Sequence, residues 1–185
     1  MEKELCGIDE AGRGCIAGPL VVAGVALLTP IDGLADSKIL SEKRRDELFP
    51  LIKKHSKYKI IFCDNNMIDK HGLSYCLGYA IKEIKEFFSE YEILMDGNST
   101  FGVSDIKTMI KADAKVPQVS AASILAKVSR DSYMYSICDE FPEYSFAKHK
   151  GYGTALHVEE IRKYGYSNIH RKSFKIKALR EPLLF

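Results

Sequence analysis

Acidic side chains follow two of the apolar runs in this sequence. Asp9 and Glu10 come directly after residues 5–8, and Asp96 comes directly after residues 92–95. Carboxylate oxygens are the ligands that Mg²⁺ and Mn²⁺ prefer, whereas zinc sites usually contain histidine or cysteine. Carboxylates crowded at the end of a strand also repel one another unless a cation neutralises them. The acids therefore indicate a site for a hard divalent cation, and a solvated acidic surface is the alternative.

A glycine-rich turn follows the first pair of acids. Neighbouring side chains of an extended strand point to opposite faces, so Asp9 and Glu10 can serve one site only where the chain turns away. We expect the strand to close at these two acids, because Gly12-Arg13-Gly14 has the composition of a turn. Both carboxylates could then face the same site.

A second group of polar side chains lies in a segment of small apolar residues. We expect a helix from Pro117 to about residue 141. Its polar residues recur at spacings of three and four and so form one stripe: Ser120, Ser123, Lys127 and Asp131. So narrow a stripe on an apolar helix predicts a buried wall that faces a polar site. The alternative is a surface ion pair between Lys127 and Asp131, worth only a few tenths of a kcal/mol.

The elements that must position these residues alternate along the chain. Residues 20–28, LVVAGVALL, are nearly all apolar, as in a strand that is buried on both faces. Ser41 is a candidate N-cap for the helix that follows. The sequence predicts strands at 5–8, 20–28, 58–63 and 92–95, and helices at 41–52, 73–88 and 154–164 besides the one after Pro117. Strands that alternate with helices predict an α/β fold with a mixed sheet, and we expect residues 1–185 to form one domain.

Composition excludes several classes of protein. The 185 residues are 46% apolar and 28% charged, which is enough apolar material for one core. The five cysteines include no C-x-x-C pair, so we expect reduced thiols rather than a disulfide framework or a zinc ribbon. No apolar run is long enough to span a membrane, and the first residues lack the pattern of a secretion signal. We therefore expect a cytoplasmic protein that does not enter a membrane.

The small net charge of +2 conceals a basic C-terminal segment. Residues 148–180 contain nine lysine and arginine side chains against two glutamates, so the rest of the chain is acidic. A basic flank beside a carboxylate-rich site is typical of proteins that bind phosphates. A solubilising tail is the alternative.

Several motifs follow one another along the chain. They are Gly7-Ile8-Asp9-Glu10-Ala11-Gly12-Arg13-Gly14, Asp36-Ser37-Lys38, Asp96-Gly97-Asn98, the block from Lys111 to Asp131, and Lys150-Gly151-Tyr152-Gly153-Thr154 with His170-Arg171-Lys172-Ser173-Phe174. In this order, and over nearly the whole chain, they resemble the bacterial ribonuclease HII family. The resemblance implies a ribonuclease H-like mixed sheet flanked by helices, with a small helical C-terminal part. It also implies hydrolysis of RNA in RNA/DNA hybrids, including single ribonucleotides embedded in duplex DNA, with Mn²⁺ or Mg²⁺ as cofactor.

The same resemblance implies roles for individual residues. Four acids would be catalytic and would bind the metal ions: Asp9, Glu10, Asp96 and Asp113. The substrate would be bound by the glycine-rich loop and by one tyrosine: Gly12, Arg13, Gly14 and Tyr152. Asp131 is a rival for the fourth acid. The related type HIII enzymes usually carry lysine in the loop, so Arg13 favours type HII.

The sequence thus predicts an endonuclease that uses two metal ions, cuts on the 5′ side of a ribonucleotide and leaves 3′-OH and 5′-phosphate ends. Its expected partners are RNA/DNA hybrids and ribonucleotide-containing duplex DNA, and we expect a monomer. The alternatives are a non-catalytic nucleic-acid binding module and a nuclease or integrase of the same broad fold. The last residues, Glu181 to Phe185, are similar to short peptides that dock on the sliding clamp, unless they pack on the protein's own core.

Overall fold

The fold is built on a five-stranded mixed sheet in a computed structural model, which describes residues 4–179. The strands are β1 (Leu5–Ala11), β2 (Leu20–Leu27), β3 (Ser56–Cys63), β4 (Glu92–Asp96) and β5 (Lys107–Met109). Their spatial order is β3-β2-β1-β4-β5. β1, β2 and β3 pair antiparallel, whereas β4 pairs parallel with both β1 and β5. The central strand is therefore β1, which also carries the first two predicted acids.

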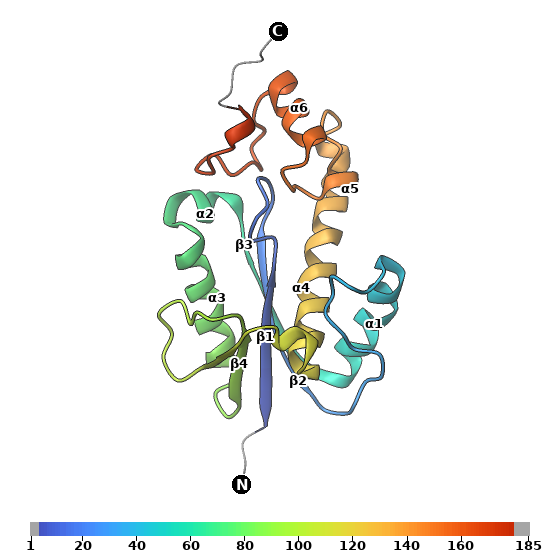
Figure 1. The fold of residues 1–185 in the computed structure, drawn as a ribbon, viewed down its shortest axis with the longest axis vertical. Coiled ribbons are helices and arrows are strands. Elements are labelled where there is room, and N and C mark those ends of the chain that lie inside the picture. The colour runs from blue at the N-terminus through green and yellow to red at the C-terminus, as the bar shows by residue number, and fades with distance from the viewer. Residues whose placement is uncertain (1–3, 180–185) are drawn as a thin grey trace.

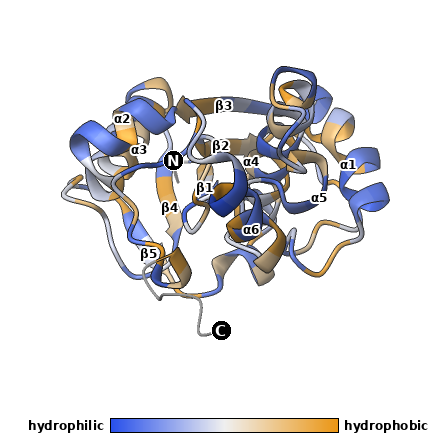
Figure 2. Ribbon diagram, turned by 90° about the horizontal axis from the view of Figure 1, so that it is seen from above, coloured by the Kyte–Doolittle hydropathy of each residue, from blue (hydrophilic) through white to orange (hydrophobic). Residues whose placement is uncertain are grey.

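Helices cover both faces of the sheet (Figure 1). They are α1 (Glu42–His55), α2 (Asn65–His71), α3 (Leu73–Phe87), α4 (Pro117–Ser136), α5 (Phe146–His149) and α6 (Ala155–Tyr164), with 3-10 helices η1 (Ala112–Ala114), η2 (Cys138–Glu140) and η3 (Lys177–Leu179). α2 and α3 lie on one side of the sheet, α1 and α4 on the other, and α5 and α6 stand at one end. The helices show both hydrophobic and hydrophilic stretches (Figure 2), as expected for helices that cover a core with one face. The predicted mixed sheet flanked by helices, with a small helical C-terminal part, is confirmed.

β2 contributes to two hydrophobic cores at once. Leu20 and Val22 pack in the core beneath α2 and α3, while Val21, Ala23 and Val25 pack in the core beneath α1 and α4. Alternate residues of a strand face opposite sides, so a strand covered on both sides must be apolar throughout. This is the physical reason for the continuous apolar run in the sequence.

The first strand departs from the prediction. It does not close at Asp9 and Glu10 but continues to Ala11. The ladder with β2 pairs Asp9 with Ala23 and Glu10 with Val22, and this pairing carries the strand past the acids. Asp9 and Glu10 consequently point to opposite faces of β1, and the chain turns only afterwards.

Other boundaries differ by smaller amounts. α4 ends at Ser136 and is followed by η2, so the helix is shorter than the predicted span to about residue 141. Ser41 caps α1 as predicted by accepting a hydrogen bond from the Arg44 N–H, but α1 continues to His55. α2, β5 and α5 are not predicted, because each is too short to show a periodic pattern. No helix within residues 4–179 is both long and apolar enough to cross a membrane.

Candidate active site

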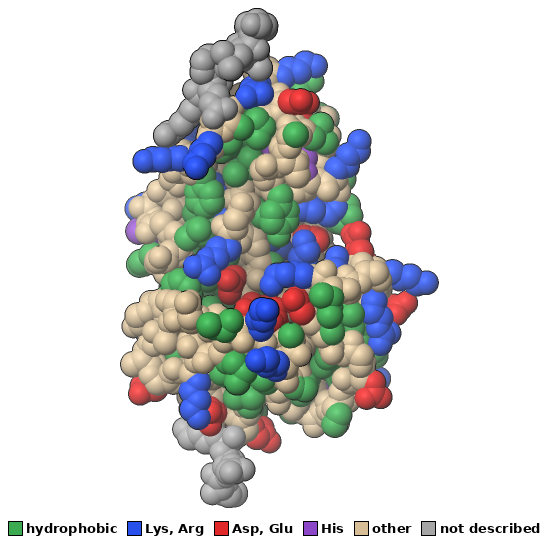
Figure 3. Space-filling view, in the orientation of Figure 1, with side chains coloured by type: hydrophobic (Ala, Val, Ile, Leu, Met, Phe, Trp, Pro, Cys, Tyr) green, Lys and Arg blue, Asp and Glu red, His purple; other side chains and the backbone are tan. Residues whose placement is uncertain are grey.

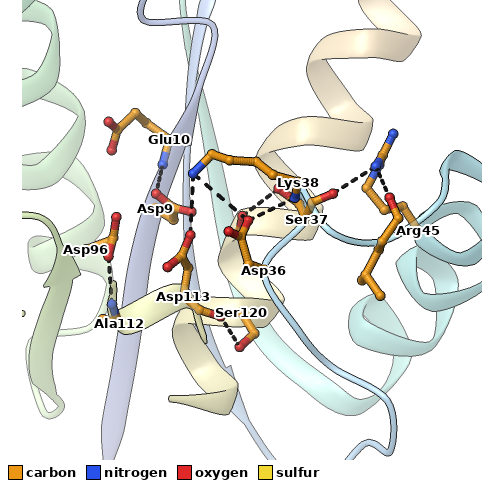
Figure 4. A network of polar contacts seen from close by, with 12 residues as sticks. Asp9, Glu10, Asp36, Ser37, Lys38, Arg45, Asp96, Ala112, Asp113 and Ser120 are labelled. Carbon is orange, nitrogen blue, oxygen red and sulfur yellow. Dashed lines mark hydrogen bonds and ion pairs between the residues drawn. The ribbon is translucent and has the colours of Figure 1, made fainter. Parts of the chain in front are cut away.

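Two neighbouring parallel strands bring the first acids together. The β1–β4 ladder pairs Ile8 with Met95, so Asp9 and Asp96 follow at the same level on adjacent strands. Asp9 is only 4% exposed and lies on the face of β1 that α4 covers. Glu10 points away from it and remains partly exposed (Figure 4). The strand pairing thus gathers three of the predicted acids around one end of the sheet.

The fourth predicted acid is placed by the turn that leads into α4. Asp113 lies in η1 and is 3% exposed. Asp96 Oδ1 accepts a 2.7 Å hydrogen bond from the Ala112 N–H, which ties η1 to the end of β4. The Ser120 hydroxyl donates to the Asp113 carbonyl at 2.6 Å, which ties η1 to the first turn of α4. Asp113 is therefore fixed from both sides.

Crowding and burial change the protonation of these acids. Burial raises the pKa of Asp9 well above its usual value, and the charges of Glu10 and Asp96 raise it further. Burial also raises the pKa of Glu10 and of Asp113, and Asp96 contributes to both shifts. The carboxylates therefore share a region of low dielectric in which a cation would be favoured.

A lysine that is not among the predicted site residues enters this region. Lys38 Nζ lies 3.4 Å from Asp113 Oδ2 and 3.9 Å from Asp36 Oδ1 (Figure 4). Burial lowers the pKa of Lys38, but the surrounding carboxylates outweigh burial and raise it overall. The Ser37 and Ser123 hydroxyls form a 2.7 Å hydrogen bond, which holds this loop against α4. The Asp36-Ser37-Lys38 motif is the signal by which the sequence could have identified Lys38.

The donor set suits a hard cation. Within residues 4–179, no three acidic, cysteine or histidine side chains are arranged to ligate one ion as they stand. The four predicted acids nevertheless offer only oxygen donors, and their electrostatic repulsion is partly offset by the Lys38 ammonium beside Asp113 and by the Arg13 guanidinium beside Glu10.

The fold requires glycine at Gly12 but not at Gly14, although both belong to the Gly12-Arg13-Gly14 loop. Gly12 has a φ of +90°, and a Cβ there would lie 2.7 Å from the Pro19 carbonyl and collide with the Arg130 side chain. Folding alone therefore requires glycine at this position. A Cβ at Gly14 would meet nothing within 4 Å, and Gly14 has no left-handed φ. The fold does not need glycine there, and the open space is available to a ligand.

Arg13 projects from this loop next to the acids. Its side chain is 56% exposed, and Nη1 lies 3.6 Å from Glu10 Oε1. Its Cζ lies 5.3 Å from the centroid of the Phe101 ring, which is a cation–π distance. The contacts with Glu10 and Phe101 thus orient the guanidinium, while much of the Arg13 side chain stays exposed to solvent.

Two fully buried arginines hold the segment that connects β1 to β2 from inside the protein. Arg130 of α4 donates to the Pro19 carbonyl at 3.0 Å. Arg171 donates to the Gly18 carbonyl at 3.0 Å. Buried charges need polar partners, and both guanidinium groups find them in backbone oxygens, although Arg171 Nη2 is buried without a hydrogen-bond partner among the described residues. Arg171 consequently does not belong to the exposed basic flank that residues 148–180 predict.

Tyr152 lies beside the same loop. An isolated β-bridge pairs its backbone with Cys15, and Tyr152 is 38% exposed. Lys127 Nζ and Arg130 Cζ lie 5.3 and 5.5 Å from the centroid of its ring. Two cations therefore support the ring while part of it faces solvent.

The polar stripe of α4 runs along the site, except at its far end. Ser120 and Ser123 meet the acidic region, and Lys127 meets Tyr152. Asp131 is paired with Lys127 at 2.9 Å, and it lines a separate cavity with residues of α1. Among the described residues, no hydrogen bond or ion pair joins Asp131 to a predicted acid. The geometry brings Asp113, and not Asp131, to the other acids.

Charge is distributed unevenly over this face of the molecule. Acidic side chains gather near the middle of the view in Figure 3, and lysine and arginine side chains lie around them. Positive charge around an acidic centre suits a polyanion whose backbone is held at the rim while one phosphate meets the carboxylates.

The sequence of this chain is similar to those of known proteins. The family model of ribonuclease HII matches residues 6–177. The chain belongs to the ribonuclease HII family. It is 59% identical to ribonuclease HII of Aliarcobacter butzleri over 97% of this chain and 94% of that one. Identity to ribonuclease HII of Sulfurovum sp. is 53%, over 99% and 97% of the two chains.

Solved structures agree with the family. The ribonuclease HII in a PCNA:RNase HII complex from Archaeoglobus fulgidus is 28% identical, with a TM-score of 0.78 over 94% of this chain and 96% of that one. The predicted ribonuclease H-like fold is thereby confirmed. The predicted enzyme class, a ribonuclease H, is confirmed by the family, which counts against a non-catalytic binding module.

Proposed function

We propose that this member of the ribonuclease HII family hydrolyses the RNA strand of RNA/DNA hybrids and cuts duplex DNA on the 5′ side of embedded ribonucleotides. The cut leaves 3′-OH and 5′-phosphate ends. The observation that carries the proposal is the convergence of Asp9, Asp96 and Asp113 near the C-terminal ends of β1 and β4. The loop that follows β1 lies beside Tyr152, so groups for chemistry and groups for recognition adjoin.

The proposed cofactor is Mn²⁺ or Mg²⁺, and the proposed catalytic and metal-binding residues are Asp9, Glu10, Asp96 and Asp113. Two such ions, held by these four acids, would supply an activated water and would stabilise the leaving 3′ oxygen. The Ala112 N–H occupies one oxygen of Asp96 and leaves the other available for a ligand. Glu10 lies on the opposite face of β1 from Asp9, but the charge of Asp96 contributes to its raised pKa, which supports a place for Glu10 in the same site.

Recognition must depend on the sugar, because the 2′-OH is what distinguishes a ribonucleotide within DNA. In our proposal the backbone at Gly12 and Gly14 approaches the ribose, since neither carries a side chain. The exposed Arg13 guanidinium holds a neighbouring phosphate. The Tyr152 ring stacks on the sugar, where its hydroxyl adds a hydrogen bond.

The test is a cleavage assay on labelled duplexes that contain no ribonucleotide, one ribonucleotide or four in a row. We expect cleavage of the second and third substrates in the presence of Mn²⁺ or Mg²⁺, with the cut on the 5′ side of a ribonucleotide. Cleavage of the all-DNA duplex would favour a nuclease or integrase of the same broad fold. Binding without cleavage, at any metal concentration, would favour a binding module.

A sliding clamp is a further proposed partner. Glu181 to Phe185 lie outside the described residues, so the support comes from their sequence. It also comes from the Archaeoglobus fulgidus protein, which was solved as a PCNA:RNase HII complex, PCNA being a sliding clamp. The monomeric state and the cytoplasmic location remain predictions.

A further inference from the structure

Three of the chain's five histidines are buried together behind the loop that carries Tyr152. His149 ends α5, His157 lies in α6, and His170 follows α6; none is more than 6% exposed. The rings of His149 and His157 stack with centroids 3.9 Å apart. The chemistry proposed above makes no use of them.

One chain of hydrogen bonds passes through two of these rings. The Ser167 N–H donates to His170 Nδ1 at 2.9 Å, so the His170 proton lies on Nε2. That Nε2–H donates to His157 Nε2 at 2.9 Å, so the His157 proton lies on Nδ1. His157 Nδ1–H then donates to the Tyr152 carbonyl at 2.9 Å. A backbone N–H can only donate and a carbonyl can only accept, so the two ends fix the direction of the chain.

A second branch holds the peptide groups just before the tyrosine ring. The Gly151 N–H donates to His149 Nδ1 at 3.2 Å, and His149 Nε2–H donates to Glu160 at 2.9 Å. The Tyr152 N–H donates to the His149 carbonyl at 2.8 Å. The Gly151 N–H, the Tyr152 N–H and the Tyr152 carbonyl are therefore all bound by histidine residues.

We propose that His149, His157 and His170 are positioning residues for Tyr152. The inference rests on the proposed function, in which the Tyr152 ring contacts the ribose. Two cations support the ring and the histidines hold its backbone, so the side chain is presented in one orientation before substrate arrives. A ring that is already ordered loses little entropy on binding, which matters most when a single ribose supplies the specific contact.

The hydrogen-bonded chain requires neutral rings. Burial lowers the pKa of His157 and of His170 to about 4 in each case. Of the charged groups that face them, Glu160 favours a proton on His157, while Lys172 disfavours one on His170. A proton added to His157 would set two N–H groups against each other at its contact with His170. At neutral pH the hydrogen-bonded chain from Ser167 to the Tyr152 carbonyl therefore has one protonation state and one direction.

The first test observes the tautomers in the wild-type protein. Long-range ¹H–¹⁵N NMR at neutral pH should show His157 protonated on Nδ1 alone and His170 protonated on Nε2 alone. A free neutral histidine favours the proton on Nε2, so the Nδ1 proton of His157 is a specific signature. A His157 ring protonated on Nε2 alone would have no proton on Nδ1 to donate to the Tyr152 carbonyl, and this result would overturn the proposal.

The second test separates positioning from packing with two variants of one residue. His157→Asn keeps a donor at the place of Nδ1 but leaves a void, whereas His157→Leu fills the volume and has no donor. The readout is kcat/KM on a single-ribonucleotide duplex divided by kcat/KM on a long hybrid. We expect His157→Asn to stay within about threefold of wild type and His157→Leu to lower the ratio about tenfold. The opposite order would mean that the histidine only packs.

Tyr152→Ala is the reference that distinguishes this inference from the proposed function. If Tyr152→Ala leaves the ratio unchanged, the tyrosine does not recognise the sugar, and both its proposed role and this inference fail. If Tyr152→Ala lowers the ratio and His157→Leu does not, this inference alone fails. Should His157→Leu not fold, a ratio for His157→Asn as low as that of Tyr152→Ala would also overturn it.

Discussion

Asp96 shows how charge and shape can be separated in a single side chain. Its Oδ1 atom accepts the Ala112 N–H, and it lies beside Asp9 on the neighbouring strand. An asparagine has the same shape and can accept the same hydrogen bond through its amide oxygen. Only the negative charge is lost, so a change in activity can be assigned to that charge.

We therefore expect Asp96→Asn to reduce cleavage by about a hundredfold or more while hybrid binding and thermal stability stay near wild type. Single-turnover cleavage in saturating Mg²⁺ and a binding titration measure the two properties. Asp105→Asn is the matched control, because that carboxylate pairs with Lys85 on the surface. Near wild-type activity of Asp96→Asn would contradict the proposed role.

The two loop glycines provide a second residue-scale prediction. Gly14→Ala should fold normally, because its Cβ meets no atom, but should weaken binding of a single-ribonucleotide duplex by about tenfold. Gly12→Ala should instead lower the melting temperature, because its Cβ collides and its φ is positive. Melting curves and binding titrations on both variants check this. Wild-type affinity in a well-folded Gly14→Ala would argue against close contact at that position.

The raised pKa values predict how pH and metal act together. Asp9, Glu10 and Asp113 keep protons in the folded, metal-free protein at pH values where the unfolded chain has lost them. Their contribution to stability is therefore lost as pH rises from about 4 through the raised values. Metal ions bind the deprotonated form, so Mn²⁺ should raise the melting temperature more at about pH 7.5 than at about pH 5.5. Melting curves with and without Mn²⁺ measure this, and an equal shift at both pH values would contradict it.

At the scale of elements, long patterned segments could be predicted from sequence and short ones could not. α3 has apolar residues at helical spacing and β2 is a continuous apolar run, so the type of each element and the faces that it buries could be predicted from its own residues. β1 runs past its acids because β2 pairs with it, which is a tertiary cause that its own residues do not encode. α2, β5 and α5 have seven, three and four residues, which is too few for a pattern.

The same division holds for the site. Asp9, Glu10 and Asp96 could be proposed from the sequence because carboxylates that follow apolar runs are visible in it, whereas Asp113 was implied only by the resemblance to the family. The burial of Arg171 could not be predicted, because its partner Gly18 lies 153 residues away and its sequence context indicates a surface charge. The pairing of His157 with His170 could not be predicted either, because only the fold brings their Nε2 atoms to 2.9 Å. Roles that depend on distant partners require the structure.

Close packing of α4 on β1 gives an element-scale prediction. A Cβ at Gly7 would lie 2.5 Å from the backbone carbon of Gln118 and closer still to Val119 N. Backbone cannot move aside like a side chain, so Gly7→Ala must push α4, which carries Ser123, away from the strand. We expect a loss of about 1–3 kcal/mol in the free energy of unfolding.

Urea denaturation measures this loss, and Gly14→Ala is the matched control, since the added methyl group there is unopposed. A cleavage assay under strongly native conditions should also show lower activity for Gly7→Ala. Wild-type stability of Gly7→Ala would mean that α4 does not lie directly on β1.

At the scale of the whole molecule, the proposed clamp partner gives a prediction about the residues after the basic segment. A peptide of residues 176–185 should bind purified sliding clamp at micromolar strength, on the order of −8 kcal/mol. The double variant Leu184→Ala, Phe185→Ala should lose this binding in the peptide and keep the wild-type melting temperature in the full chain. Calorimetric titration and melting curves check the two parts.

The peptide with both alanines serves as the control. A peptide that does not bind, together with a lower melting temperature of the double variant, would mean that these residues pack on the protein's own core. That result would leave the proposed nuclease activity unaffected.

The parallel pairing of β1 with β4 has a consequence for synthesis on the ribosome. The ladder joins Leu5 to Glu92, so β1 leaves the ribosome long before its second neighbour exists. Until then the nascent sheet has an open, apolar edge at the strand that carries Asp9 and Glu10. Such an edge invites pairing with other chains, and contacts of this sequence separation form slowly. The first strand to be translated is thus among the last to be completed, and nascent chains in crowded polysomes would be most prone to aggregate through it.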